Sequence, residues 1–126
     1  MTSLLRGLTT NHAETDPAGA AGPRGRTYAV PFEQVWTATL GLARRRRGWT
    51  VLLADDLEGL ICAEARTPLR FVDDVEIRIG LDENAQTRVD LRSASRKGVG
   101  DLGKNARRIR RFLRALDREL RGRGRR

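Results

Sequence analysis

The chain has 126 residues, 39% hydrophobic and 33% charged, which is enough for one modest core and too little for a second domain. No apolar run approaches the ~20 residues that span a bilayer, and the apolar N-terminal stretch is too short for a signal peptide, so we expect a cytoplasmic protein. One cysteine, Cys62, excludes an internal disulfide, and one histidine, His12, leaves no set of zinc ligands and no Ser–His–Asp triad. We therefore expect no metal and no cofactor.

The net charge of +9 is unevenly distributed. Residues 104–126 hold 11 of the 25 basic residues and 2 of the 16 acidic ones, whereas residues 1–103 are neutral overall. An arginine-rich C-terminal helix and tail favour nucleic acid or an anionic membrane surface as a partner, with strong salt dependence. Few aromatic residues accompany the arginines, which predicts poor base selectivity. The alternative is a tail that only increases solubility.

Composition also predicts the domain limits. Residues 1–25 lack periodicity, and glycine, proline and alanine dominate residues 17–25, so we interpret residues 1–25 as a flexible leader. One folded domain is expected over residues 26–120, followed by a basic tail at residues 121–126.

The first elements of the domain are a short strand and a helix. Residues 26–30 alternate as a strand does. Pro31 suits the first helical position, and apolar residues then recur at helical spacing as far as Ala43. We interpret Arg44–Arg47 as a solvated last turn, with Gly48 ending the helix.

The rest of the chain contains four segments predicted as strands, followed by a final helix. Strands are predicted at residues 49–54, 60–65, 71–81 and 88–95, and an amphipathic helix at residues 101–120. Short connections between successive strands favour antiparallel pairing. The fold class is therefore α+β: a single domain in the order β-α-β-β-β-β-α, with an antiparallel sheet of four to five strands. Both helices pack on one face of this sheet, the long C-terminal helix among them.

The last two strands also predict their own register. A three-residue loop at residues 83–85 keeps the two apolar faces together. It pairs Ile79 with Val89, Ile77 with Leu91, Val75 with Ser93, Arg78 with Asp90, and Glu76 with Arg92. Both charged pairs are opposite in sign, and each would contribute about 0.2–1 kcal/mol.

A literal G-x-G-x-x-G, GVGDLG, occupies residues 98–103 between the last strand and the last helix. A dinucleotide-binding loop also requires a second parallel strand after the helix, and none follows here. Asp101 would moreover place a carboxylate where the pyrophosphate approaches. We therefore interpret the segment as a strand-to-helix turn that Asp101 caps.

Polar residues concentrate around this turn. Arg92, Arg96 and Lys104 surround the expected start of the helix, which favours a bound phosphate or carboxylate. The candidate binding residues are Asp73, Asp74, Arg92, Ser93, Ser95, Arg96, Asp101 and Asn105. A hydrogen-bonded network that only holds the loop to the sheet is the structural alternative. An enzyme using Asp73 or Asp74 is a further alternative, but adjacent strand residues point to opposite faces, so we predict no catalytic residue.

Two segments resemble a known family. RFVDDVEIRI at residues 70–79 and VDLRSASRKGVGDLGKNARRIRRFL at residues 89–113 resemble the family catalogued as domain of unknown function 1499, over about residues 27–116. The shared pattern comprises Phe71, Asp73, Asp74, Arg92, Ser93, Ser95, Arg96, Gly98, Asp101, Gly103, Asn105, Arg108 and Ile109. At the position of Gly100 the family commonly has a residue other than glycine, which implies that the match to G-x-G-x-x-G is incidental. The family has no established activity, so the resemblance implies no mechanism. Many of its members resemble exported or lipid-anchored envelope proteins, whereas a Gly/Ala/Pro leader stands here in place of their cysteine-containing segment.

Three hypotheses follow for function. The first is a small, non-enzymatic binding or interaction module whose partner is a small anionic ligand or a protein. The second is attachment to nucleic acid or an anionic membrane through the C-terminal arginines. The third is an enzyme using Asp73 or Asp74. A related structural alternative, suggested by the likeness of residues 28–51 to the opening of helix-grip domains, is an apolar ligand cavity between sheet and long helix, although the chain has few strands for that fold.

Overall fold

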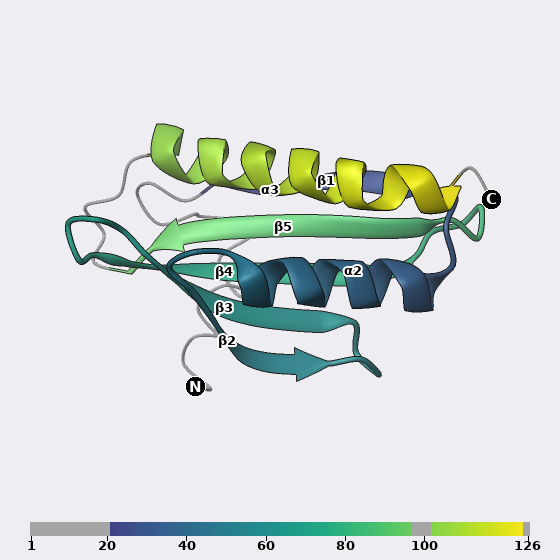
Figure 1. Ribbon diagram of the computed structural model, residues 1–126, viewed down its shortest axis with the longest axis horizontal. Coiled ribbons are helices and arrows are strands. Elements are labelled where there is room, and N and C mark those ends of the chain that lie inside the picture. Colours follow the sequence, from purple (N-terminus) through teal and green to yellow (C-terminus); the bar gives the residue numbers. More distant parts are fainter. Residues whose placement is uncertain (1–20, 97–101, 125–126) are drawn as a thin grey trace.

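The computed structural model of the chain describes residues 21–96 and 102–124. Within those residues, five strands form one antiparallel sheet in the order β1-β5-β4-β3-β2, and two helices pack on one face of it (Figure 1). The elements are β1 (Ala21–Tyr28), α2 (Phe32–Arg45), β2 (Trp49–Asp55), β3 (Leu60–Arg66), β4 (Val72–Leu81), β5 (Thr87–Ser95) and α3 (Leu102–Gly124). The predicted fold class and element order are confirmed.

The first strand begins five residues earlier than predicted. It was expected at residues 26–30 and lies at Ala21–Tyr28, paired with β5 from Ser93 onward. β1 is the edge of the sheet, where a proline costs no ladder hydrogen bond on its outer side. Gly22 has a φ of +110° and lies so close to β5 that an added Cβ would collide with the Leu91 carbonyl oxygen. Pairing with β5 therefore extends a strand into a segment whose composition suggests a loop.

The two helices also differ at their ends from the sequence expectation. Pro31 precedes α2 as its N-cap, and its carbonyl oxygen accepts the N–H groups of Gln34 and Val35, each at 3.1 Å. Helix α3 continues to Gly124, past the predicted end at Leu120. Asp101, the predicted cap of α3, lies outside the described residues.

The predicted register of the β4–β5 hairpin is confirmed at every pair. The loop is closed by Ala85, whose φ of 61° is left-handed and whose N–H donates to the Asp82 carbonyl oxygen at 3.0 Å. The expected cross-strand ion pair of Arg78 with Asp90 is wrong. Arg78 Nη2 lies 2.7 Å from Glu76 Oε2 on its own strand, and Arg88 likewise pairs with Asp90. Residues two apart on a strand lie on the same face of the sheet. A carboxylate on the same strand can therefore compete for an arginine with the carboxylate opposite it on the neighbouring strand.

The core lies between the helices and the sheet. Ile77 and Leu91 of the sheet, Ile109 and Phe112 of α3, and Val35 of α2 are all fully buried. Each such side chain contributes about 1.5–3 kcal/mol to folding through the apolar surface it removes from water. These side chains occupy the space in which the helix-grip alternative placed an apolar cavity. In the part of the chain that the structure describes, neither helix is both long and apolar enough to cross a membrane.

Candidate functional site

The residues predicted as one binding cluster lie on both faces of the sheet. Adjacent strand residues point to opposite faces, so the sheet separates Asp73 from Asp74. The helix side holds Asp73, Ser93, Ser95 and Asn105; the other side holds Asp74, Arg92 and Arg96. The remaining predicted residue, Asp101, lies outside the described residues. Arg92 and Arg96 are thus apart from Lys104, with which they were expected to surround the start of α3.

On the helix side, Asn105 joins α3 to β5. Its amide oxygen accepts a hydrogen bond from Ser93 Oγ at 2.6 Å, and its Nδ2 donates to Ser95 Oγ at 3.1 Å. Asn105 and Ser93 are completely buried, and a buried polar group is tolerated only when it is hydrogen-bonded. This network fixes the position of the first turns of α3 on the sheet.

Asp73 lies beside this network and is 1% exposed. Its Oδ2 accepts a hydrogen bond from Arg108 Nη1 at 2.7 Å and lies 3.0 Å from Lys104 Nζ. The same Nη1 lies 3.1 Å from Ser93 Oγ and 2.9 Å from Asn105 Oδ1. One buried carboxylate thus fixes two cations of α3 at the end of the sheet.

On the other face, ion pairs within the protein hold Arg96 and Asp74. Arg96 donates to Asp74 and, at 2.8 Å, to Glu64 Oε2. These hydrogen bonds raise the pKa of Arg96 above its ordinary value. Arg92 Nη1 donates to the Gly22 carbonyl oxygen at 3.5 Å, and burial lowers the pKa of Arg92. Arg96 is therefore occupied by carboxylates and does not offer its charge to a ligand.

A pocket of about 340 Å³ opens on the helix side at this end of the sheet. It forms where α2 stops: Gly48 adopts a φ of +82°, and its carbonyl oxygen accepts the N–H of Arg66 at 2.8 Å. This turn brings Arg46 and Arg47 beside the end of β3, opposite the start of α3 (Figure 1). Three separate segments therefore supply the walls: the α2–β2 turn, the end of β3 with its following loop, and the first turns of α3.

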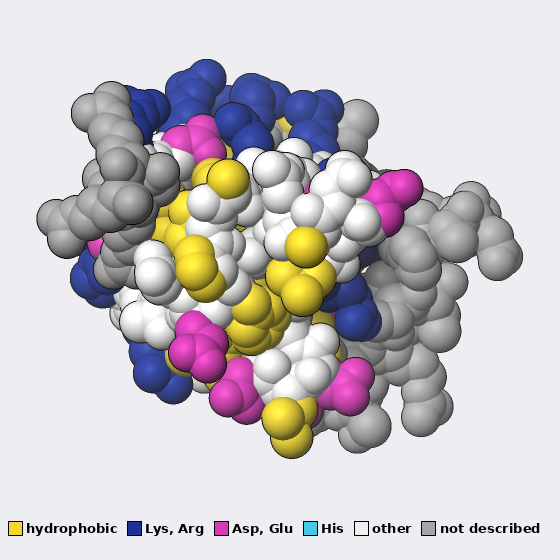
Figure 2. Space-filling view, turned by 90° about the vertical axis from the view of Figure 1, so that its right-hand side faces the viewer, with side chains coloured by type: hydrophobic (Ala, Val, Ile, Leu, Met, Phe, Trp, Pro, Cys, Tyr) yellow, Lys and Arg dark blue, Asp and Glu magenta, His cyan; other side chains and the backbone are white. Residues whose placement is uncertain are grey.

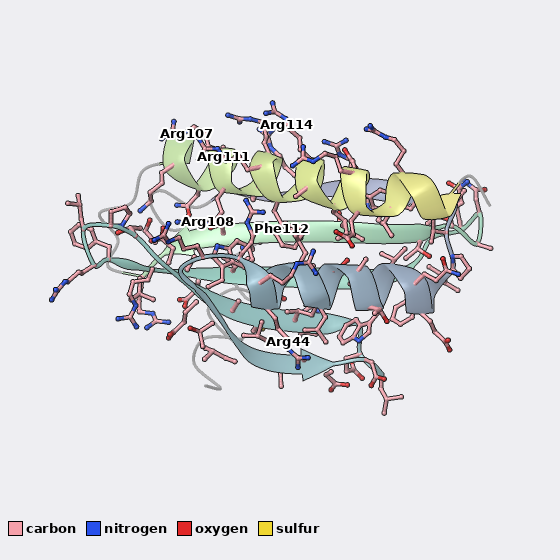
Figure 3. All side chains as sticks on the ribbon, in the orientation of Figure 1. Arg44, Arg107, Arg108, Arg111, Phe112 and Arg114 are labelled. Carbon is pink, nitrogen blue, oxygen red and sulfur yellow. The ribbon has the colours of Figure 1, made fainter. Side chains whose placement is uncertain are left out.

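Basic side chains dominate the lining of this pocket, which we call the basic pocket. None of the described residues that line it is acidic. Its lining residues are Arg46, Arg47, Arg66, Lys104, Arg107, Arg108, Arg111, Trp49, Ala65, Thr67 and Pro68. Asp73, behind Lys104 and Arg108, supplies one negative charge against the seven positive ones. Figure 3 shows Arg108 and Phe112 between α3 and the sheet, whereas Arg107 lies on the outer side of the helix.

Among the described residues, most of these cations have no counter-ion. Within the described residues, Arg46, Arg47, Arg66, Arg107 and Arg111 form no ion pair. The Arg46 guanidinium lies 5.9 Å from the Trp49 ring centre and 5.7 Å from that of Phe112. Burial lowers the pKa of Arg46, and repulsion from Arg111 and Arg118 lowers it further. Such mutual repulsion is relieved when an anion enters.

The chemistry available in the basic pocket suits binding. Its lining offers cations, the Trp49 ring and one hydroxyl, that of Thr67, which already accepts the N–H of Phe71 at 3.1 Å. Cys62 is buried, and burial raises its thiol pKa to about 12, so it is protonated at neutral pH and a poor nucleophile.

Sequence reasoning missed most of the basic pocket. Of its cations, only Lys104 is predicted as part of the anion site at the start of the last helix. Arg107, Arg108 and Arg111 enter only through the hypothesis that the arginine-rich helix as a whole binds nucleic acid or an anionic membrane, and Arg108 also through the family pattern. The signal that was available is the run of four arginines at residues 44–47, which is more positive charge than the end of one helix requires. The approach of this run to Arg66 and α3 depends on how the helices pack on the sheet.

Comparison with known proteins identifies the family and adds a distant likeness. Residues 11–116 match the model of a family described as protein of unknown function (DUF1499). The comparison with curated proteins finds no match. Among solved structures, one described as the crystal structure of Ara h 8.0201 is 8% identical, with a TM-score of 0.40 over 82% of this chain and 97% of that one. The match to the family model covers most of the chain and confirms the resemblance carried by the hairpin and the start of α3. The chain therefore belongs to the DUF1499 family.

Proposed function

We propose that this protein is a small, non-enzymatic binding module whose basic pocket holds a ligand with several negative charges, such as one bearing two or more phosphate groups. The observation that carries the proposal is the set of seven cationic side chains around about 340 Å³, with one carboxylate behind them. Guanidinium groups bind phosphate and carboxylate oxygens through paired, charge-assisted hydrogen bonds. A ligand with several charges satisfies more of the five unpaired arginines than a single anion does.

In this proposal the predicted residues of the helix side position the binding groups and do not touch the ligand. Asp73 fixes Lys104 and Arg108 at the rear of the basic pocket. Asn105, through Ser93 and Ser95, holds the first turns of α3 against β5. Binding sites built on such buried, hydrogen-bonded supports lose little entropy when the ligand enters.

Isothermal titration calorimetry with phosphate, pyrophosphate and tripolyphosphate tests the proposal. We expect affinity to rise with the charge of the probe and to fall with added salt. The double variant Arg107→Gln/Arg111→Gln removes two groups of the basic pocket. A hydrogen bond to a charged group contributes about 1.5–3 kcal/mol, so the loss in tripolyphosphate affinity should be at least about tenfold.

The matched control is Arg110→Gln/Arg114→Gln, which removes the same charge from the same helix outside the basic pocket. Both control residues are exposed. The control should change the affinity by less than about twofold, because exposed charges at a distance are screened. Equal losses in the two double variants, or no binding of any probe by the unmodified protein, would contradict the proposal.

The outer face of α3 supports a second candidate function, the binding of nucleic acid. Arg110, Arg114, Arg118 and Arg121 are exposed, and within the described residues they form no ion pair. Figure 2 shows Lys and Arg side chains along the upper edge of the molecule, over α3. The same variants separate the two functions. Binding of a fluorescent DNA duplex, followed by anisotropy, should depend on Arg110 and Arg114 if this candidate is correct.

A further inference from the structure

The connection between β3 and β4, residues 67–71, places exposed apolar side chains beside the basic pocket. Thr67 and Pro68 line the pocket, and the next residues, Leu69 and Phe71, are 78% and 47% exposed. In Figure 1 this connection forms the far left tip of the molecule, beyond the start of α3. We call residues 67–71 the apolar tip.

The apolar tip is held by hydrogen bonds within itself. The Thr67 N–H donates to the Phe71 carbonyl oxygen, and the Arg70 N–H donates to the Thr67 carbonyl oxygen, each at 2.9 Å. The Phe71 N–H donates to Thr67 Oγ1 at 3.1 Å, and Arg70 takes a left-handed φ of 69°. Arg70 thus adopts an uncommon backbone conformation in the turn that leaves Leu69 and Phe71 exposed to solvent.

The free charges near the apolar tip are positive. Arg70 follows Leu69 and Arg66 directly precedes the tip; both are exposed, and the other arginines of the basic pocket lie next to them. The carboxylates of Asp73 and Asp74, which follow Phe71, are paired with cations of the protein. Exposed apolar side chains within a positive field match an anionic bilayer, whose interface accepts apolar groups and whose headgroups attract Lys and Arg. A nucleic acid surface satisfies the arginines but offers nothing to an exposed leucine.

We infer that this end of the molecule docks on an anionic membrane, with Leu69 and Phe71 entering the interface and the basic pocket receiving the phosphate groups of several neighbouring lipid headgroups. The inference rests on the proposed function and identifies its anion. The chain contains its own comparison. Leu57, 93% exposed in the β2–β3 turn, is flanked by Asp56 and Glu58, and an anionic surface repels that turn.

Co-sedimentation of the full chain with vesicles tests the inference. The vesicles are phosphatidylcholine alone, or phosphatidylcholine mixed with phosphatidylglycerol. We expect binding to the mixed vesicles only. Leu69→Ser/Phe71→Ser should weaken it about tenfold or more, because two apolar side chains no longer enter the interface. Leu57→Ser, the matched control, should change it by less than about twofold.

Calorimetry with pyrophosphate on the same variants keeps the two proposals apart. The apolar-tip variant should bind pyrophosphate like the unmodified protein, since neither Leu69 nor Phe71 lines the basic pocket. If the protein binds pyrophosphate but the apolar-tip substitutions do not change its binding to vesicles, the membrane inference is wrong and the proposed function is still supported. Equal sedimentation with neutral vesicles, or sedimentation unaffected by Arg107→Gln/Arg111→Gln, overturns the assignment of the headgroup to the basic pocket.

Discussion

The two ends of the sheet use their charged residues in opposite ways. At the hairpin end, carboxylates close the turns: Asp55 Oδ1 accepts the N–H groups of Leu57 and Glu58, and Asp82 Oδ1 accepts those of Asn84 and Gln86. Figure 2, which looks at this end, shows Asp and Glu scattered among uncharged and apolar side chains. At the basic-pocket end, five arginines form no ion pair with any described residue.

Under the proposed function, this difference separates charge that serves folding from charge that serves a ligand. A charge needed for the fold is satisfied within its own turn or network, as Asp82 is. The arginines of the basic pocket repel one another, and this repulsion destabilises the fold as long as no anion is bound. Sites kept for function commonly sacrifice stability in this way. The predictions below test this contrast.

The largest effect is expected from Asp73→Asn, which removes the one carboxylate behind the basic pocket. Lys104 and Arg108 then lack their counter-charge, and breaking a buried pair costs about 3–5 kcal/mol. Because Lys104 is 29% exposed, we expect a cost below this range, about 2–3 kcal/mol of unfolding free energy, measured by urea denaturation. Pyrophosphate affinity should stay equal or rise, because the basic pocket gains net positive charge.

Asp74→Asn is the control for that variant, one residue away and on the other face. Arg96 keeps Glu64 as a partner, so the cost should stay below about 1 kcal/mol. A folded Asp73→Asn protein that no longer binds pyrophosphate would contradict the expected affinity, and would mean that holding Lys104 and Arg108 in place matters more for binding than the removed negative charge.

An intermediate effect is expected at the opposite end from Asp82→Ala. The hairpin loop loses two hydrogen bonds from backbone N–H groups that water replaces only in part, at a cost of about 1 kcal/mol. The urea midpoint should fall, and the pyrophosphate affinity should not change. A loss of affinity would mean that the two ends are coupled, and the contrast between them would fail.

The fold could be predicted because its decisive signals are local. Alternation over residues 71–81 and 88–95, joined by a short loop, allows one register that keeps both apolar faces together. The start of β1 could not be predicted in this way, because residues 21–25 carry no alternation of their own. That strand exists through its pairing with β5, a contact distant in sequence.

The part of the candidate site that depends on local sequence could be predicted, and the part that depends on distant contacts could not. Asp73, Ser93 and Ser95 follow from the hairpin register, and Asn105 lies close because the helix starts just after β5. The arginines of the basic pocket come from segments that meet only through helix-to-sheet packing. Arg46 in particular was interpreted as part of a solvated turn, and its packing over Trp49 and Phe112 has no local signature.

The smallest effect, and the one that tests the contrast most directly, is expected from Arg111→Gln. The substitution removes a charge that lowers the pKa of Arg46 by repulsion and that forms no ion pair within the described residues. We therefore expect the unfolding free energy to stay equal or to rise by up to about 0.5 kcal/mol at low ionic strength. The gain should vanish at high salt, because screening already weakens the repulsion in the unmodified protein. Thermal unfolding over a salt series measures both values. A clear loss of stability would mean that Arg111 serves the fold, and that the basic pocket resembles the hairpin end more than its unpaired charges indicate.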